Sequence, residues 1–422
     1  MYDITTLKNG LRIVSLNMPA MKSVSIGIWV AAGGRFENKS NNGISHLLEH
    51  LVFKGTKNRT VRRIKEDIEG IGGSLNAFTS EEYTCYLAKV TGKHLALAVD
   101  VLSDMILYPL LNERDLKKEK IVVCEEIRMY HDLPMQYVHE LLQELLWPNQ
   151  PLGMNLTGTE ETVNSITRAD LLRFRRKYYN PANIVISVCG DVNNKVLIKE
   201  VEKRFSKIAK AVKNSFSKSG TIQKKQGFDF YFKETEQTHL CLGLPVFGRS
   251  HPDRYVLTLL NIILGGNMSS RLFQEVREKR GLAYDIHSSL SRYKETGAFV
   301  VSAGVENKQV FQTISVIMKV LNKIKKDQVS LAEFRRAKDF CTGQLLMALE
   351  GTSHHMSWMG EQLISRDRVK TQAQVLKAIE QVSREDLLRV ADFIFKDKAL
   401  NLAVIGPTKE KTIKKIKGGL GF

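Results

Sequence analysis

Residues 166–173 read Ile-Thr-Arg-Ala-Asp-Leu-Leu-Arg, and residues 382–389 read Val-Ser-Arg-Glu-Asp-Leu-Leu-Arg. The two copies are offset by 216 residues, and the same offset separates Gly190 from Gly406, each of which ends an apolar run (406 − 190 = 216). Each copy predicts a helix followed by a strand, because a hydroxyl residue precedes the helical pattern where it can accept from first-turn amides. A repeat over this distance indicates a duplicated domain.

Length and composition fit two domains of this kind. At 422 residues the chain exceeds the size at which one hydrophobic core stops growing. The stretch 207–225 is rich in Ser and Lys and predicts a linker. We therefore predict domains at 1–206 and 226–422, both of the α+β class, each with a mainly antiparallel sheet covered by helices.

Local patterns predict the elements of the first half. The turn signal Lys8-Asn9-Gly10 separates two short apolar runs, 2–7 and 11–16, which is typical of a hairpin. Apolar residues at every second position of 24–30 indicate a strand with one face in a core. The other predicted elements are strands at 74–79 and 82–90 and helices at 44–53, 60–68, 94–108, 115–130 and 136–147.

The cysteines are scattered, and none forms a Cys-x-x-Cys pair. They are Cys85, Cys124, Cys189, Cys241 and Cys341. We expect reduced core residues and hence a reducing compartment. No leader pattern follows Met1, and no apolar run approaches the ~20 residues of a membrane span. The expectation is a soluble, cytoplasmic protein without a membrane partner.

A formal charge of +18 raises the question of a nucleic-acid partner. The basic residues are spread along helical stretches such as 62–65 and 335–338, as on solvated faces. No arginine-rich arm, zinc finger or aromatic RNA-binding strand is present in the sequence. We therefore expect no nucleic-acid binding. The alternative, a basic nucleic-acid-associated protein, predicts binding that weakens steeply with salt.

A candidate metal motif lies on the helix predicted at 44–53. His46 and His50 are four residues apart and share one helix face, with Glu49 beside the second histidine. Two histidines and a carboxylate would leave the fourth position of Zn²⁺ for water, whose pKa the metal lowers to about 7. Glu49 is then placed to act as the base. A chance histidine pair on an amphipathic helix is the alternative.

A third ligand is predicted on the helix at 115–130. Glu119 and Glu126 lie seven residues apart, which is two helical turns, so they share a face. Glu125 is the competing candidate, but it is rotated by about 100° from Glu126. The second copy's counterpart of the metal helix, 257–262, has no histidine or glutamate. One metal site per chain is therefore expected.

These motifs resemble the inverzincins, the zinc peptidases of the pitrilysin, insulinase and mitochondrial processing peptidase family. The resemblance covers nearly the whole chain, and its signature runs through 34–37 and 42–56. It implies that His46, His50 and Glu126 bind Zn²⁺ and that Glu49 is the general base. It also implies that Glu119 is an accessory carboxylate.

The resemblance assigns further residues to the substrate. Residues 73–79 are similar to the family's edge strand, onto which a peptide adds as a further strand, with Asn76 and Ala77 as the contact positions. Residues 277–284 resemble the segment whose arginine and tyrosine grip the substrate near the scissile bond. Arg277 and Tyr284 are these residues here, and they would stabilise the developing oxyanion.

The resemblance also implies an architecture and an activity. The fold would be that of the LuxS and mitochondrial processing peptidase metallohydrolases, with a catalytic N-terminal domain and an inactive C-terminal repeat. Family members close a chamber from four such domains, so two such chains would form a clamshell. We expect a bacterial-type zinc endopeptidase that cleaves peptides or unfolded, presequence-like segments, as a homodimer or with a paralogue. The alternatives are the catalytic subunit of a heterodimeric processing peptidase and a non-catalytic scaffold paralogue.

Overall fold

The computed structural model describes residues 2–219 and 225–420. The predicted linker, 207–225, thus lies partly outside the described residues. The chain divides into two units, and each combines three segments. Unit 1 comprises Met1–Arg128, Asn155–Ser217 and Leu346–Thr371, and unit 2 comprises Met129–Met154, Lys218–Leu345 and Gln372–Phe422.

Unit 1 is built on a six-stranded sheet. Its strands are β1 (Asp3–Thr6), β2 (Arg12–Asn17), β3 (Ser23–Val30), β4 (Ser74–Thr79), β5 (Thr84–Thr91) and β6 (Ile184–Gly190). Their order is β1-β2-β6-β3-β5-β4, and only the β2–β6 pair is parallel among these strands. β4 therefore forms one edge of this sheet.

The sheet of unit 2 repeats that topology. Its strands are β7 (Gly227–Phe232), β8 (Gln237–Phe247), β9 (Ala283–Arg292), β10 (Thr296–Glu306) and β11 (Asn401–Gly406). Their order, β7-β11-β8-β10-β9, matches β2-β6-β3-β5-β4 strand for strand, including the one parallel pair, β11 with β7. The predicted duplication and the α+β class are confirmed.

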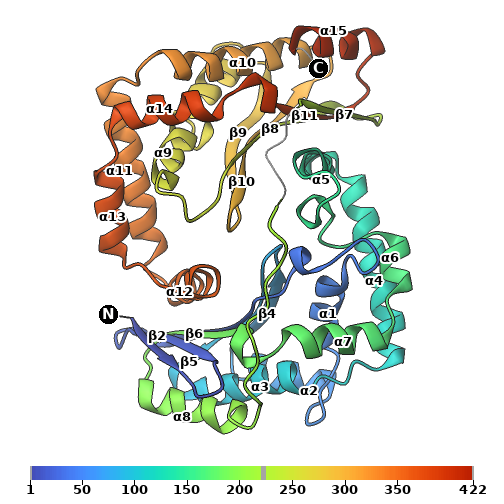
Figure 1. Ribbon diagram of the computed structural model, residues 1–422, viewed down its shortest axis with the longest axis vertical. Helices are drawn as coiled ribbons and strands as arrows, with labels where there is room; N and C mark the ends of the chain where they lie inside the picture. Colours follow the sequence, from blue (N-terminus) through green and yellow to red (C-terminus); the bar gives the residue numbers. More distant parts are fainter. Residues whose placement is uncertain (1, 220–224, 421–422) are drawn as a thin grey trace. The chain divides into compact units, whose positions relative to one another are not determined.

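Helices flank both sheets (Figure 1). Those mainly in unit 1 are α1 (Ile44–Val52), α2 (Val61–Glu69), α3 (Leu95–Leu107), α4 (Glu113–Asp132), α6 (Glu160–Ser165), α7 (Arg168–Tyr178), α8 (Asn194–Phe205) and α12 (Thr352–Arg366). Those mainly in unit 2 are α5 (Pro134–Leu146), α9 (Arg254–Gly265), α10 (Val310–Lys326), α11 (Leu331–Ala348), α13 (Gln372–Glu380), α14 (Arg384–Ile394) and α15 (Glu410–Leu420). The predicted elements of the first half differ from these bounds by at most two residues at either end.

Two equivalent helices are exchanged between the repeats, so the units differ from the continuous domains predicted at 1–206 and 226–422. α5 belongs to unit 2 and α12 to unit 1. Gly27 and Gly243 occupy equivalent positions in the two sheets, 216 residues apart (243 − 27 = 216). Because neither has a side chain, each exchanged helix can pack closely against its sheet. A Cβ on Gly27 would lie 2.5 Å from the Met356 sulfur of α12, and one on Gly243 would lie 2.9 Å from the Leu142 Cδ1 of α5.

The exchanged helix changes the environment of β3, for which the alternation had predicted one buried face. Both faces are buried, and Ser25 and Trp29 on the second face are each 1% exposed. Trp29 packs in a cluster with Met356 and Leu363 of α12. The prediction of a one-sided strand was wrong because the covering helix lies more than 300 residues further along the chain (352 − 30 = 322).

Candidate metal centre

α1 divides into a buried and a half-buried face. Apolar residues such as Leu47, Leu48 and Leu51 are completely buried, as expected for one stripe of an amphipathic helix. His46, Glu49 and His50 are the partly exposed residues of this helix. Packing of the apolar stripe therefore turns all three polar side chains to the same side.

The N-terminus of α1 is capped by a distant carboxylate, because its N-cap residue, Gly43, has no side chain. Glu37 accepts hydrogen bonds from the backbone N–H groups of Gly43, at 2.7 Å, and Ser45, at 2.9 Å. The Asn42 amide donates a third bond, at 3.0 Å. Burial raises the pKa of Glu37, although these hydrogen bonds oppose the shift. A carboxylate here also complements the helix dipole.

The structure brings His46, His50 and Glu126 together. One ligand atom from each lies within 4.8 Å of the other two, and this is the metal-type cluster found among the described residues. Glu126 Oε2 is 3.7 Å from His46 Nε2 and 3.8 Å from His50 Nε2. Two imidazole nitrogens and one carboxylate oxygen form a donor set suited to Zn²⁺.

The protonation of His46 suits metal binding. Burial, and then the neighbouring charge of His50, lower the pKa of His46 to about 4. The ring is therefore neutral near neutral pH, which is the form that binds a metal.

His50 is oriented by Glu119. The Nδ1 of His50 lies 3.2 Å from a Glu119 oxygen, and the Lys54 ammonium lies 2.7 Å from the other oxygen. Burial lowers the pKa of His50, but the Glu119 bond and the nearby carboxylates outweigh it, so the pKa is raised. Burial opposes ionisation of Glu119, yet His50 and Lys54 hold its pKa below the ordinary value. Such a carboxylate fixes the orientation of a ligand histidine.

Glu125, the competing third ligand, lies on another face of α4. Its side chain is 65% exposed, and it forms an ion pair with Arg128 at 2.6 Å. The Glu126 side chain is 23% exposed and is directed at the two histidines. Glu126 and not Glu125 therefore faces the histidines, as the helix spacing predicts.

Glu49 stands beside this cluster without belonging to it. The Thr79 hydroxyl, at the end of β4, donates a 2.5 Å hydrogen bond to Glu49 Oε2. Burial raises the pKa of Glu49, and the Thr79 bond opposes the shift. A carboxylate with a raised pKa is a stronger proton acceptor than an exposed one, as general-base chemistry requires.

Asn76 and Ala77 lie on β4, the edge strand. Asn76 is exposed and Ala77 is partly buried. The side of β4 away from β5 has no neighbouring strand among the described residues. An open edge of this kind can accept an extended peptide.

Arg277 and Tyr284 lie in unit 2. Arg277 is on a short π-helix, Phe273–Glu278, and Tyr284 is on β9, an edge strand. The Arg277 guanidinium lies 4.7 Å from the centre of the Tyr284 ring, whose residue is 76% exposed. The structure therefore places the two predicted substrate residues side by side.

Sequence reasoning missed Glu37, Lys54 and Thr79. Lys54 follows His50 by four residues, a spacing that could have suggested a shared helix face. Glu37 and Thr79 lack such a signal, because their contacts depend on how separate segments pack.

Two family models match the chain. Residues 12–160 match the one described as insulinase (peptidase family M16), and residues 165–340 match the peptidase M16 inactive domain. A protein named as an uncharacterized zinc protease, YmxG of Bacillus subtilis (strain 168), is 41% identical over 96% of this chain and 98% of its own length. A zinc protease, also named uncharacterized, from Streptomyces coelicolor is 36% identical over 98% of this chain and 91% of its own.

Solved structures share the fold. A protease from Helicobacter pylori has a TM-score of 0.91 and 24% identity, covering 96% of this chain and 99% of that one. A chain of complex III2 from Candida albicans has a TM-score of 0.86 and 20% identity, covering 99% of both. No helix among the described residues combines the length and apolar character needed to cross a membrane.

Proposed function

Because the chain belongs to the insulinase (M16) peptidase family, we propose that it is a zinc endopeptidase that cleaves extended or unfolded peptides. One observation carries the proposal. His46, His50 and Glu126 converge within 4.8 Å, and Glu49 lies beside them without joining the cluster. A ligand set with an adjacent free carboxylate fits hydrolysis better than structural metal binding.

His46, His50 and Glu126 would hold Zn²⁺. When bound, the metal activates water and polarises the scissile carbonyl. Glu49 accepts a proton from the attacking water and passes it to the leaving amine. The Thr79 hydroxyl holds the Glu49 carboxylate through a 2.5 Å hydrogen bond. Glu119 orients His50, and Lys54 keeps the Glu119 carboxylate ionised.

The peptide is proposed to bind along β4 at Asn76 and Ala77. Backbone hydrogen bonds supply most of the affinity in such strand addition, so varied sequences are accepted. Arg277 and Tyr284 would supply hydrogen-bond donors to the carbonyl oxygen as negative charge develops on it. The exposure of Tyr284 and the adjacency of the two side chains support this role.

We infer a homodimer as the working form, with a heterodimer as the alternative. The support is the resemblance to clamshell peptidases built from four domains of this type, of which this chain has two. We also infer a reducing compartment, because the five cysteines are free and four of them are buried.

The test combines metal analysis with cleavage of an unfolded model peptide. The purified chain should hold about one zinc per chain, cleave the peptide, and lose activity with a chelator until zinc is restored. A zinc-loaded chain that cleaves no peptide would favour the alternative of a non-catalytic scaffold. The presence of the whole His46, His50 and Glu126 cluster argues against that alternative.

A further inference from the structure

A cleft in unit 2 carries an excess of basic side chains. It has a volume of about 520 Å³ and lies between α10 and residues 269–280. Four basic and two acidic side chains line it (4 − 2 = 2). They are Arg271, Arg280, Lys319 and Lys323, with Glu275 and Glu333. The cleft therefore has a net positive charge.

The acidic side chains are already neutralised by arginines. Glu333 accepts from Arg271 Nε, at 2.8 Å, and Nη2, at 2.7 Å. Glu275 accepts from Arg280 Nη1 at 2.6 Å. Neither carboxylate is therefore available to the lysines of the opposite wall.

Lys319 and Lys323 remain uncompensated. They lie one turn apart on α10, are exposed, and form no ion pair with any residue that the structure describes. A wall with two adjacent free ammonium groups favours an anionic ligand.

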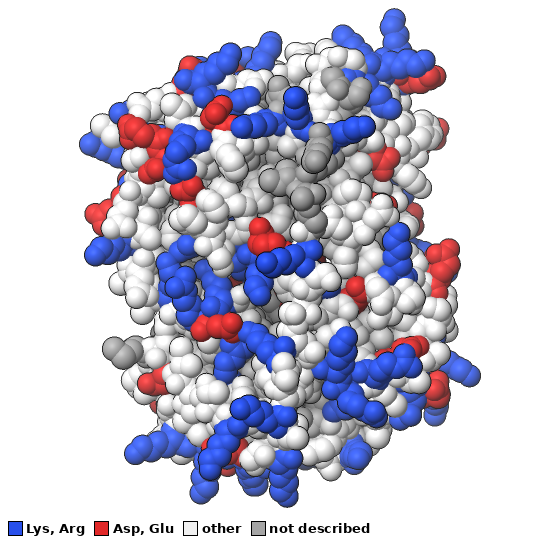
Figure 2. Space-filling model, in the orientation of Figure 1, with Lys and Arg blue, Asp and Glu red and all other residues white. Residues whose placement is uncertain are grey.

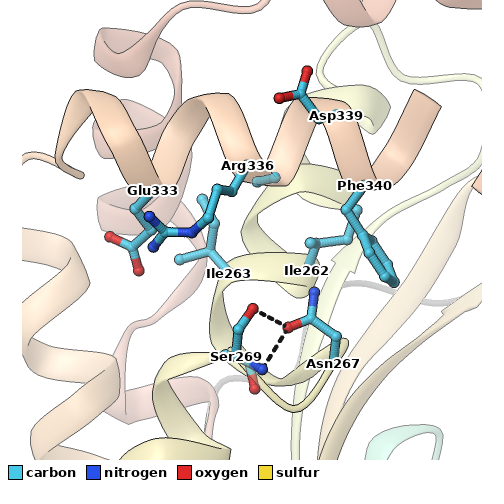
Figure 3. A pocket seen from close by; sticks show the side chains of 10 residues that line it. Ile262, Ile263, Asn267, Ser269, Glu333, Arg336, Asp339 and Phe340 are labelled. Carbon is cyan, nitrogen blue, oxygen red and sulfur yellow. Dashed lines mark hydrogen bonds between the residues drawn. The ribbon is translucent and has the colours of Figure 1, made fainter. Parts of the chain in front are cut away.

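A smaller pocket adjoins the cleft and shares Ser269 and Glu333 with it (Figure 3). Its volume is about 290 Å³. Its apolar part is formed by Ile262, Ile263, Ala337 and Phe340, and its polar lining includes Asn267, Arg336 and Asp339. Figure 3 shows Phe340 extending from α11 toward the side on which Asn267 lies, whereas Asp339 points away. A pocket of this size suits one large apolar side chain.

We propose that these two pockets together bind an acidic peptide segment that carries one bulky apolar side chain. The carboxylates pair with Lys319 and Lys323, and the apolar side chain enters the pocket at Phe340. The net charge of +18 also favours acidic partners. Figure 2 shows Lys and Arg over much of the visible face with acidic residues between them, so the proposal rests on the cleft and not on a single basic face.

This site is separate from the proposed metal centre, although Gln274 and Glu275 of the cleft lie on the same short helix as Arg277. All its residues belong to unit 2, whereas the metal cluster belongs to unit 1. Binding can therefore be measured without cleavage, on a chain whose metal centre carries out no hydrolysis.

The experiment measures binding of labelled peptides to the full-length Glu49→Gln chain by fluorescence anisotropy. The probe carries several Glu residues around one Phe; one control replaces Phe with Ala, and another replaces each Glu with Lys. We expect the acidic, Phe-containing peptide to bind best and to weaken with added salt. The Lys peptide should not bind.

Charge reversal locates the site. Lys319→Glu with Lys323→Glu should weaken binding about tenfold or more, since two attractive contacts become repulsive. Lys308→Glu with Lys326→Glu makes the same charge change at exposed positions outside the cleft and should have little effect. Equal losses in both variants, no loss in either, or indifference to the Phe would overturn the proposal.

Discussion

The Thr79 hydroxyl donates a 2.5 Å hydrogen bond to the Glu49 carboxylate. This bond links the edge strand β4, where a peptide is proposed to bind, to the proposed base on α1. A peptide bound on this strand and the proposed base would thereby be held in a fixed relation. Geometry of this kind lowers the entropic part of a reaction barrier.

The Thr79 contact predicts a selective kinetic defect. Thr79→Val removes the hydroxyl while keeping the shape, so Glu49 loses its fixed orientation. We expect kcat to fall about tenfold or more, with zinc content unchanged. Thr79→Ser should restore most of the rate, because the donor returns. Equal rates for the valine and serine variants would contradict the positioning role.

The two neighbouring glutamates of α4 predict opposite outcomes for metal affinity. Glu126→Gln should weaken zinc binding by at least the roughly 10–100-fold known for changes near metal sites. Glu125→Gln, whose side chain is 65% exposed, should leave affinity unchanged. Competition with a chromophoric chelator measures both. A larger effect from Glu125 would show that the assigned helix face is wrong.

Glu37 predicts coupling between folding and the metal site. Glu37→Ala leaves the Gly43 and Ser45 N–H groups without their acceptor, which should cost about 1–3 kcal/mol of unfolding free energy. Because α1 carries both histidines, zinc affinity should fall as well. Denaturant unfolding of the metal-free chain and a zinc titration measure the two effects.

Glu66→Ala is the matched control for Glu37. Glu66 pairs with Arg62 on the surface of α2, where such a pair contributes little. A stability loss as large as that of Glu37→Ala, or an unchanged zinc affinity in Glu37→Ala, would argue against the capping role.

The proposed dimer predicts complementation, because the metal cluster and the Arg277–Tyr284 pair belong to different units. Glu49→Gln and Tyr284→Phe chains should each be nearly inactive. If the two parts of a working site come from different subunits, exchanged mixed dimers should regain activity. Subunit exchange is followed with differently tagged chains. Mixed dimers without activity would mean that both parts act within one chain or that the partner is a different protein.

Locally encoded features could be predicted from the sequence. Thr60 caps α2 by accepting from the Arg63 N–H, and the turn at Gly10 closes the β1–β2 hairpin. The repeat of 166–173 at 382–389 revealed the duplication. Spacing alone suggested that Glu126 shares a face with Glu119, and both lie beside the histidines.

Features that depend on distant packing could not be predicted. The exchange of α5 and α12 leaves no local signal, because an apolar helix stripe does not specify which sheet it covers. The hydrogen bond between Thr79 and Glu49 joins residues 30 apart, and the Glu37 cap depends on an intervening loop. Each follows from tertiary contacts that neither periodicity nor capping rules encode.

The most direct test of the central claim is the activity and metal content of Glu49→Gln. The glutamine keeps the size of the side chain but cannot accept the proton, and Glu49 lies outside the metal cluster. We expect full zinc content, unchanged unfolding and a fall in kcat of about 10²–10⁴-fold. A variant that retains zinc and most of its peptidase activity would contradict it.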